Sequence, residues 1–249
     1  MSDIHRTSES YSGHAAAGRG ASEPGGNCSF ESEKRQTYPA GTELFGQGTP
    51  VRDVFWLDDG LVKLVHVKPD GGERILGLRF SPRPLGVALA VVKLPSPVSA
   101  VTVTRCQIRR ISGHDLARAI AADERLSAVV HRAQSEEVLE QFQMLAELSA
   151  SSSRDRLEHF LLRLVVALSI TTANMRLQLP LKHYEIAQFL AVTPEHLSRL
   201  FRQLCDEGVI GFHKGWLTIK RLDRLAGTSD ACRVRRDSDR SSSPDRLSA

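Results

Sequence analysis

The spacing of apolar residues changes near Ser112, and this change constrains the fold more than any other feature. Over residues 38–111 the apolar residues occur in short runs that are broken by Gly, Asp and Pro. The turn sequences Asp59-Gly60 and Asp70-Gly71-Gly72 separate such runs and favour β-hairpins. From His114 onward the apolar residues recur at the three- and four-residue spacing of helices. We therefore expect an α+β chain in which an N-terminal β-roll precedes a series of helices.

Differences in composition predict where the segments begin and end. The two end segments are rich in polar residues and hold few large apolar side chains, so they cannot bury enough surface to offset the entropy of ordering. We expect a disordered arm at residues 1–35, a β-roll sensor domain at 36–122, a dimerisation helix at 123–150, a winged helix-turn-helix at 151–225 and a disordered tail at 226–249.

The overall composition excludes several classes of protein. Of the 249 residues, 41% are hydrophobic and 25% are charged, which is typical of globular domains. No run approaches the roughly 18 apolar residues that span a bilayer, and the N-terminus lacks the apolar core of a signal peptide. The sequence therefore predicts a cytoplasmic protein without a membrane partner. The net charge of +4 is compatible with a polyanionic partner, although it is common among other proteins too.

The long helix expected from Asp123 to about Leu148 carries an apolar stripe between the two predicted domains. Polar residues at 134–137 interrupt the stripe, so it is not a regular coiled-coil seam. Its position favours a homodimer interface, and the alternative is packing on the core of its own domain. The residues expected to form the dimer contact are Leu126, Val130, Ala133, Leu139, Phe142 and Leu145.

A second helical unit begins after residue 180 and has a well-defined start. Thr193 is a good N-cap, Pro194 suits the first helical position, and Glu195 favours the positive end of the helix dipole. The apolar face of this helix leaves charged and polar side chains exposed on its other faces. Residues 208–212 and 216–219 then predict two strands around a turn that contains Lys214. The pattern indicates a winged helix-turn-helix that inserts its second helix into the major groove of DNA, although an unrelated helical hairpin can have the same spacing.

This part of the chain resembles the helix-turn-helix of the Crp-Fnr superfamily of bacterial transcription regulators. The residues that carry the resemblance are Leu179-Pro180-Leu181, Glu185-Ile186-Ala187, Leu190, Thr193, Glu195, Ser198-Arg199 and Leu204. A weaker resemblance in the β-roll involves Pro39-Ala40-Gly41-Thr42, Phe45-Gly46-Gln47-Gly48, Gly60 and residues 71–76. The family resemblance implies a homodimer on a palindrome, with an effector sensed in the roll and relayed through the long helix. It also implies contact with RNA polymerase if the protein is an activator.

Within the family, the second helix is most similar to the Fnr/FixK branch, because Glu195, Ser198 and Arg199 match its Glu-x-x-Ser-Arg pattern. That similarity implies TTGA-type half-sites, with Arg199 and Glu195 on a G·C pair. The alternative is that Glu195 and Arg199 form only a surface ion pair. The residues expected to contact DNA are Thr193, Glu195, His196, Ser198, Arg199, Arg202 and Lys214.

Four residues depart from the family pattern. Lys182 stands where the family has a Ser or Thr cap, and Ala191 replaces the usual glycine of the turn. Both should weaken the local geometry without removing base-reading groups. In the sensor, Pro82 and Arg83 replace a Gly-Asp pair.

The effector and any cofactor are unknown from the sequence. Val87 and Val98 stand where cyclic-nucleotide-binding members have a Glu and an Arg, so a cyclic phosphate would meet no counter-charge. This argues against cyclic-nucleotide binding. Val87, Leu89 and Val91 could instead line an apolar pocket, and haem ligation by His66 stays open. A regulator that has lost its effector and acts constitutively or through a protein partner is the alternative.

The cysteines argue against a four-cysteine iron–sulfur cluster, because only Cys28 and Cys106 lie in the relevant regions. A sensing dithiol between these two, or oxidation of Cys205, is possible from the sequence, and buried inert thiols are the alternative. An enzyme of the cupin type would need a His-x-His pair, and His66-Val67-Lys68 offers only one imidazole. We therefore expect no enzymatic activity.

Overall fold

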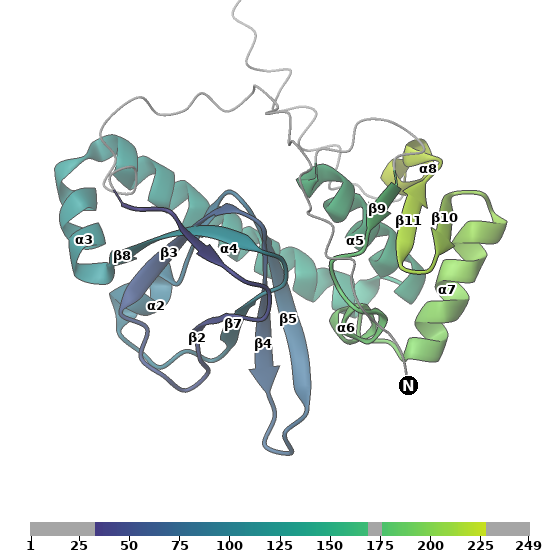
Figure 1. The fold of residues 1–249 in the computed structure, drawn as a ribbon, viewed down its shortest axis with the longest axis horizontal. Coiled ribbons are helices and arrows are strands. Elements are labelled where there is room, and N and C mark those ends of the chain that lie inside the picture. Colours follow the sequence, from purple (N-terminus) through teal and green to yellow (C-terminus); the bar gives the residue numbers. More distant parts are fainter. Residues whose placement is uncertain (1–32, 169–175, 228–249) are drawn as a thin grey trace, which may run out of the picture.

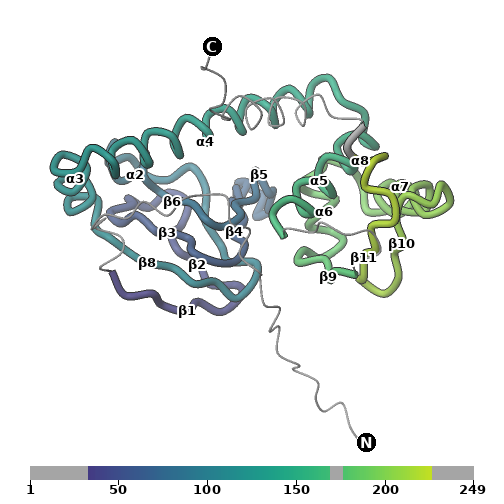
Figure 2. Tube along the Cα trace, turned by 90° about the horizontal axis from the view of Figure 1, so that it is seen from above, coloured from purple at the N-terminus to yellow at the C-terminus, as the bar shows by residue number. Residues whose placement is uncertain are grey.

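The computed structural model describes residues 33–168 and 176–227 (Figure 1). Most of the expected N-terminal arm and C-terminal tail therefore lies outside the described residues. The described residues form an N-terminal sensor unit and a C-terminal helical unit. A long helix, α4, runs along one side of both units (Figure 2). No helix in these two ranges is long and apolar enough to cross a membrane.

The sensor unit is a roll of two four-stranded antiparallel sheets. One has the order β1 (Gln36–Tyr38), β8 (Cys106–Ser112), β3 (Asp53–Asp59) and β6 (Arg83–Leu85). The other has the order β2 (Glu43–Phe45), β7 (Ser99–Thr102), β4 (Leu61–Val67) and β5 (Glu73–Phe80). Apolar side chains such as Phe55, Leu57, Val62 and Ile108 fill the space between the sheets. The expected α+β fold with a β-roll is confirmed.

The β3–β4 turn depends on Gly60. Its φ is 109°, which L side chains rarely adopt, and a Cβ there would lie 2.6 Å from Cys106 Sγ. A side chain at this position would meet both backbone strain and a steric clash with the buried thiol.

We expect Gly60→Ala to lower the free energy of unfolding by roughly 1–3 kcal/mol. Gly71→Ala is the matched control, because Gly71 also has a positive φ, 81°, but has open space around its Cβ position. In the control, the free energy of unfolding should fall only by the cost of a side chain on a left-handed backbone, about 1 kcal/mol. Urea denaturation followed by circular dichroism measures both values. Equal losses in the two variants would show that contact with Cys106 adds nothing.

A short helix that the sequence did not predict interrupts the roll between β6 and β7. Helix α2 (Val87–Val92) begins after Gly86, and its Val87 packs against α3 (Gly113–Ala122) and α4 (Glu124–Ala150). Val91 is 63% exposed and Leu89 is only half-buried. The suggested apolar pocket of Val87, Leu89 and Val91 is therefore wrong, because Val87 is buried in a packed cluster, Leu89 lies on another side of the helix and Val91 is exposed.

Helix α4 has two apolar faces, and this corrects two of the six residues expected at a dimer contact. Leu126 and Val130 are 2% and 4% exposed and belong to the core of the sensor unit. They are not accessible to a partner subunit. Farther along, Leu139, Phe142 and Leu145 are 59–65% exposed, while Ala133 is half-buried.

The C-terminal unit combines helices with a small antiparallel sheet. Helix α5 (Ser153–Ala167) is followed by β9 (Arg176–Gln178), α6 (His183–Phe189), α7 (Pro194–Asp206), β10 (Ile210–His213), β11 (Trp216–Ile219) and α8 (Leu222–Gly227). The three strands are ordered β10, β11, β9. The expected helix-turn-helix and β wing are present, with β9 as a third strand that pairs with β11.

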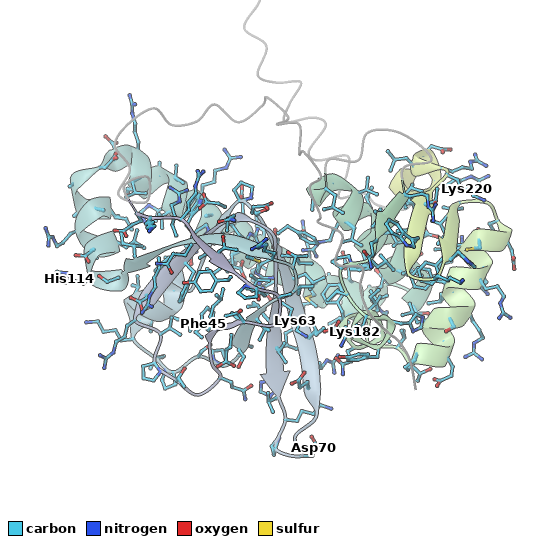
Figure 3. The ribbon with its side chains drawn as sticks, viewed as in Figure 1. Phe45, Lys63, Asp70, His114, Lys182 and Lys220 are labelled. Atoms are coloured by element: carbon cyan, nitrogen blue, oxygen red, sulfur yellow. The ribbon has the colours of Figure 1, made fainter. Side chains whose placement is uncertain are left out.

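The two units share a continuous apolar core. Leu61, Val65, Ile75 and Leu78 of the sensor sheet pack with side chains of α5, α6 and α7. Beside this core, Lys63 Nζ of β4 lies 2.5 Å from Glu185 Oε1 of α6, and both side chains are largely buried. Figure 3 labels Lys63 at the place where the two units meet. The sensor therefore contacts the helix-turn-helix directly as well as through α4.

Candidate nucleic-acid interface

Helix α7 lies on the side of its unit away from the sensor (Figures 1 and 2), and its first turn is fixed by local capping. The Thr193 side chain accepts a hydrogen bond from His196 N at 3.2 Å, and Pro194 occupies the first helical turn. This cap satisfies one of the free N–H groups of the helix. One face of α7 is buried through Leu197, Leu200, Phe201 and Leu204. The opposite face is thereby held toward solvent.

The exposed face of α7 carries four of the expected DNA-binding residues, namely Glu195, Ser198, Arg199 and Arg202. The pKa of Glu195 is lowered, first by a hydrogen bond from its own backbone N–H and then by the Thr193 side chain, and the charge of Arg199 adds to this. Glu195 is therefore an ionised acceptor at neutral pH. Ser198 Oγ donates to Pro194 O at 2.9 Å, which orients the hydroxyl along the helix.

His196 occupies a different environment from these residues. It is half-buried, and its Nε2 lies 2.7 Å from Ser153 Oγ at the start of α5. At the other end of α7, the Arg154 guanidinium holds the carboxylate of Glu207, the C-cap residue. Two neighbouring residues of α5 thus hold both ends of α7, and the ring of His196 already has a protein partner.

The wing adds two candidate interface residues, Arg176 and Trp216, that the sequence analysis missed. The Arg176 guanidinium of β9 lies 5.3 Å from the centre of the Trp216 ring of β11, and Trp216 is 40% exposed. Only the pairing of β9 with β11 brings these residues together, and the pairing is invisible in local spacing. At the tip, Lys214 is exposed and has a φ of 49°. The tip therefore presents a lysine charge to solvent.

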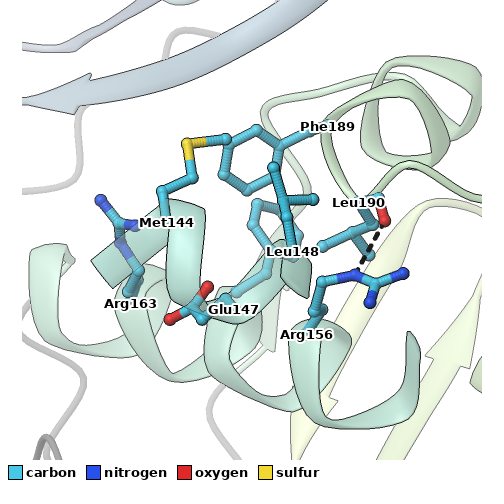
Figure 4. Close-up of a pocket in the computed structure, with 8 residues that line it drawn as sticks. Met144, Glu147, Leu148, Arg156, Arg163, Phe189 and Leu190 are labelled. Atoms are coloured by element: carbon cyan, nitrogen blue, oxygen red, sulfur yellow. Dashed lines mark hydrogen bonds between the residues drawn. The ribbon is translucent and has the colours of Figure 1, made fainter. Parts of the chain in front are cut away.

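The departures from the family pattern in the helix-turn-helix are accommodated by other residues. Lys182 N donates to Glu185 Oε2 at 2.8 Å, so half of a capping box remains although a lysine side chain cannot accept a hydrogen bond. Ala191 adopts a φ of 53° in the turn. Arg156 Nε donates to the preceding carbonyl, Leu190 O, at 3.0 Å (Figure 4). These bonds hold the turn without the usual serine cap and glycine.

The cysteines do not form an evident sensor in the described ranges. Cys106 is fully buried, and burial raises the pKa of its thiol more than hydrogen bonds to Thr104 and Leu61 lower it. A protonated, buried thiol is a poor nucleophile, so a sensing dithiol through Cys106 does not fit. Cys28 lies outside the described residues, and Cys205 is half-buried near the end of α7. Within residues 33–168 and 176–227, no group of three or more His, Cys, Asp or Glu residues is placed to hold a metal ion.

The two positions expected to hold a cyclic nucleotide carry no charge in the sensor. Val87 packs in an apolar cluster, and Val98 is half-buried and supplies no charge. The buried cations Arg79 and Arg109 are paired with Glu137 and Asp58, respectively. Each of these two buried arginines is therefore already neutralised by a carboxylate of the chain.

Two family models match the chain. Residues 35–123 match the cyclic nucleotide-binding domain, and residues 155–228 match the Crp-like helix-turn-helix domain. The first range contains the roll together with α2 and α3, and the second contains all but the start of α5 together with the helix-turn-helix and wing.

Curated relatives and solved structures agree with these matches. A probable transcriptional activator of Rhizobium leguminosarum bv. viciae is 29% identical over 178 residues, which are 71% of this chain and 72% of that protein. Transcriptional activator protein FnrA of Stutzerimonas stutzeri is 26% identical over 172 residues, 68% and 70% of the two chains. The structure of FixK2 from Bradyrhizobium japonicum has a TM-score of 0.69 at 20% identity and covers 80% of this chain and 98% of that one. The chain therefore belongs to the Crp/Fnr family of transcription regulators, whose members matched here are DNA-binding regulators rather than enzymes.

Proposed function

We propose that this regulator binds a TTGA-type palindrome as a homodimer and that a signal acting on the β-roll controls binding. The observation that carries the proposal is the exposed edge of α7, where Glu195, Ser198 and Arg199 stand on a helix fixed by its cap and its buried face. Arginine can donate two hydrogen bonds to guanine O6 and N7, and a carboxylate can accept from cytosine N4. The lowered pKa of Glu195 supports the second role.

The remaining predicted contact residues have supporting roles in this proposal. Arg202 and Lys214 are exposed cations on α7 and the wing, where they can bind phosphates. Thr193 supports DNA binding by capping α7. His196 lies near the start of α5, where a hydrogen bond with Ser153 orients its ring.

The exposed part of α4 supports a homodimer. Val138, Leu139, Phe142 and Leu145 are 53–65% exposed within two turns of helix. A 27-residue helix is about 40 Å long, so an antiparallel pair would place the two helix-turn-helix units at opposite ends. A palindrome requires both units on one side of the dimer, about 34 Å apart. The proposed dimer therefore pairs the α4 helices in parallel.

Activation is the proposed mode of regulation, because two of the matched relatives are named as transcriptional activators. An activator of this kind would bind RNA polymerase as well as DNA.

Fluorescence anisotropy tests the proposed site. Purified protein is titrated at fixed salt against a TTGAT-N4-ATCAA duplex and against a scrambled duplex of the same composition, with and without reductant. We expect the palindrome to bind more than a thousandfold more tightly than the scrambled duplex, as is typical of specific DNA binding. Equal affinity for both duplexes would exclude this half-site. A change with reductant would assign part of the signal to a thiol.

A further inference from the structure

Two arginines of the sensor reach two glutamates on the inner face of α4. Arg79 of β5, whose side chain is 3% exposed, pairs with Glu137. Arg83 of β6 donates to both carboxylate oxygens of Glu140, at 2.8 and 2.9 Å, and lies 3.5 Å from Glu137. We call this set of four residues the sensor–helix junction.

The position of Arg79 is fixed by its surroundings. Its Nη1 donates to Leu78 O at 3.1 Å, and a Cβ on Gly77 would lie 2.5 Å from that nitrogen. Gly77 thus leaves the space through which the guanidinium passes. An arginine buried to this degree is strongly destabilising when its carboxylate partner is removed, so the pairing with Glu137 constrains where α4 can lie.

Glu140 extends the junction to the DNA-binding unit. Arg163 Nη2 of α5 lies 3.9 Å from Glu140 Oε2, so one carboxylate faces arginines from both units. Burial alone would raise the pKa of Glu140, but the hydrogen bonds and charge of Arg83, with the charges of Arg163 and Arg79, outweigh it and lower the pKa. The carboxylate is therefore ionised at neutral pH. A single charged group thus links the sensor, the long helix and α5.

We infer that the sensor–helix junction takes the place of a small-molecule effector and holds the sensor, α4 and the DNA-binding unit in the DNA-binding arrangement without a ligand. In a sensor that depends on an effector, the ligand supplies contacts that favour one arrangement of the two units. Here the chain itself supplies charged contacts between the sensor and α4. The uncharged Val87 and Val98 stand where cyclic-nucleotide-binding members have a Glu and an Arg. The inference rests on the proposed function: binding needs no small molecule, and the signal that acts on the β-roll would control binding by opening this junction.

The test uses the full-length protein, confirmed to be free of small molecules by native mass spectrometry. Anisotropy with the TTGAT-N4-ATCAA duplex is measured with and without added cyclic AMP, cyclic GMP or cyclic di-GMP. We expect the ligand-free protein to bind at full strength and the added nucleotides to change the affinity less than twofold. Binding that requires a cyclic nucleotide would overturn the inference and leave the proposed function intact.

Variants test the role of the junction itself. Glu140→Gln keeps the shape of the side chain and removes its charge, and we expect a loss of specific affinity between about five- and a hundredfold, the usual range for coupling between sites. Glu136→Gln is the matched control, because Glu136 is exposed on α4, pairs with Arg132 and acts on Arg83 less strongly than Glu140 and Glu137 do. Unchanged affinity in Glu140→Gln would overturn the inference.

Hydrogen exchange separates failure of the inference from failure of the proposed function. If neither the wild type nor any variant binds a duplex, the half-site assignment fails. Hydrogen exchange then tests the junction independently of DNA binding. We expect Glu140→Gln to speed amide exchange in α4 and α5, and Glu136→Gln to leave exchange in α5 unchanged. Equal exchange in wild type and Glu140→Gln would overturn the inference irrespective of DNA binding.

Discussion

Phe142→Asp is expected to leave the protein monomeric and to weaken its binding to the palindrome at least a hundredfold. Phe142 is 65% exposed, and Val138 and Leu145 lie four residues before it and three after it on the same face of α4. In a parallel two-fold pair, the side chains at such positions meet their own counterparts. The substitution would place two carboxylates opposite each other in an apolar seam, where burying unpaired charge is strongly unfavourable.

Light scattering and anisotropy measure the two effects of Phe142→Asp. The wild-type mass should be twice the 27.4 kDa of one chain, and the variant should have the mass of a single chain. Because linking two binding modules raises affinity by about 10²–10⁴, the variant should lose at least a hundredfold in affinity for the full palindrome. Gln143→Asp is the control, since Gln143 is an exposed neighbour off the apolar stripe. A dimeric Phe142→Asp protein would place the interface elsewhere.

The correction of two expected dimer residues follows from what helical spacing can encode. Spacing identifies apolar positions on a helix but not the partner of each face. Leu126 and Val130 continue the periodic pattern, yet they face the sensor core, while Phe142 and Leu145 face solvent. Along its whole length α4 has one face packed on the two units, through Glu137, Glu140 and Glu147 in its second half, and a sequence does not reveal which face that is.

The start of α7 could be predicted because its determinants are local. Thr193, Pro194 and the following apolar stripe act within one helix, so propensity and capping rules apply directly. The contacts that join the elements are distant in sequence. Arg79 and Glu137 are separated by 58 positions, and Ser153 and His196 by 43. No local pattern indicates such pairs, so the sensor–helix junction and the anchoring of α7 became visible only in the folded chain.

Arg199→Ala is expected to relax sequence preference as well as weaken binding. Arg199 is exposed on α7 four residues after Glu195, one helical turn away. If its guanidinium donates two hydrogen bonds to a guanine, removing it should cost about 1–3 kcal/mol for each contact, and a dimer loses two contacts. The cost should be largest on the intact palindrome. It should vanish on a duplex in which the contacted G·C pair has been replaced.

Lys214→Ala is the control that distinguishes base reading from phosphate binding. Lys214 is exposed at the tip of the wing, where a phosphate contact would weaken binding equally on all duplexes and reduce the salt slope by about 1. Anisotropy titrations of both variants across single-base substitutions and two salt concentrations separate the patterns. A loss in Arg199→Ala that is the same on every duplex would assign the arginine to the backbone. Specificity would then have to come from Glu195 and Ser198, because these are the remaining exposed polar side chains in the first two turns of α7.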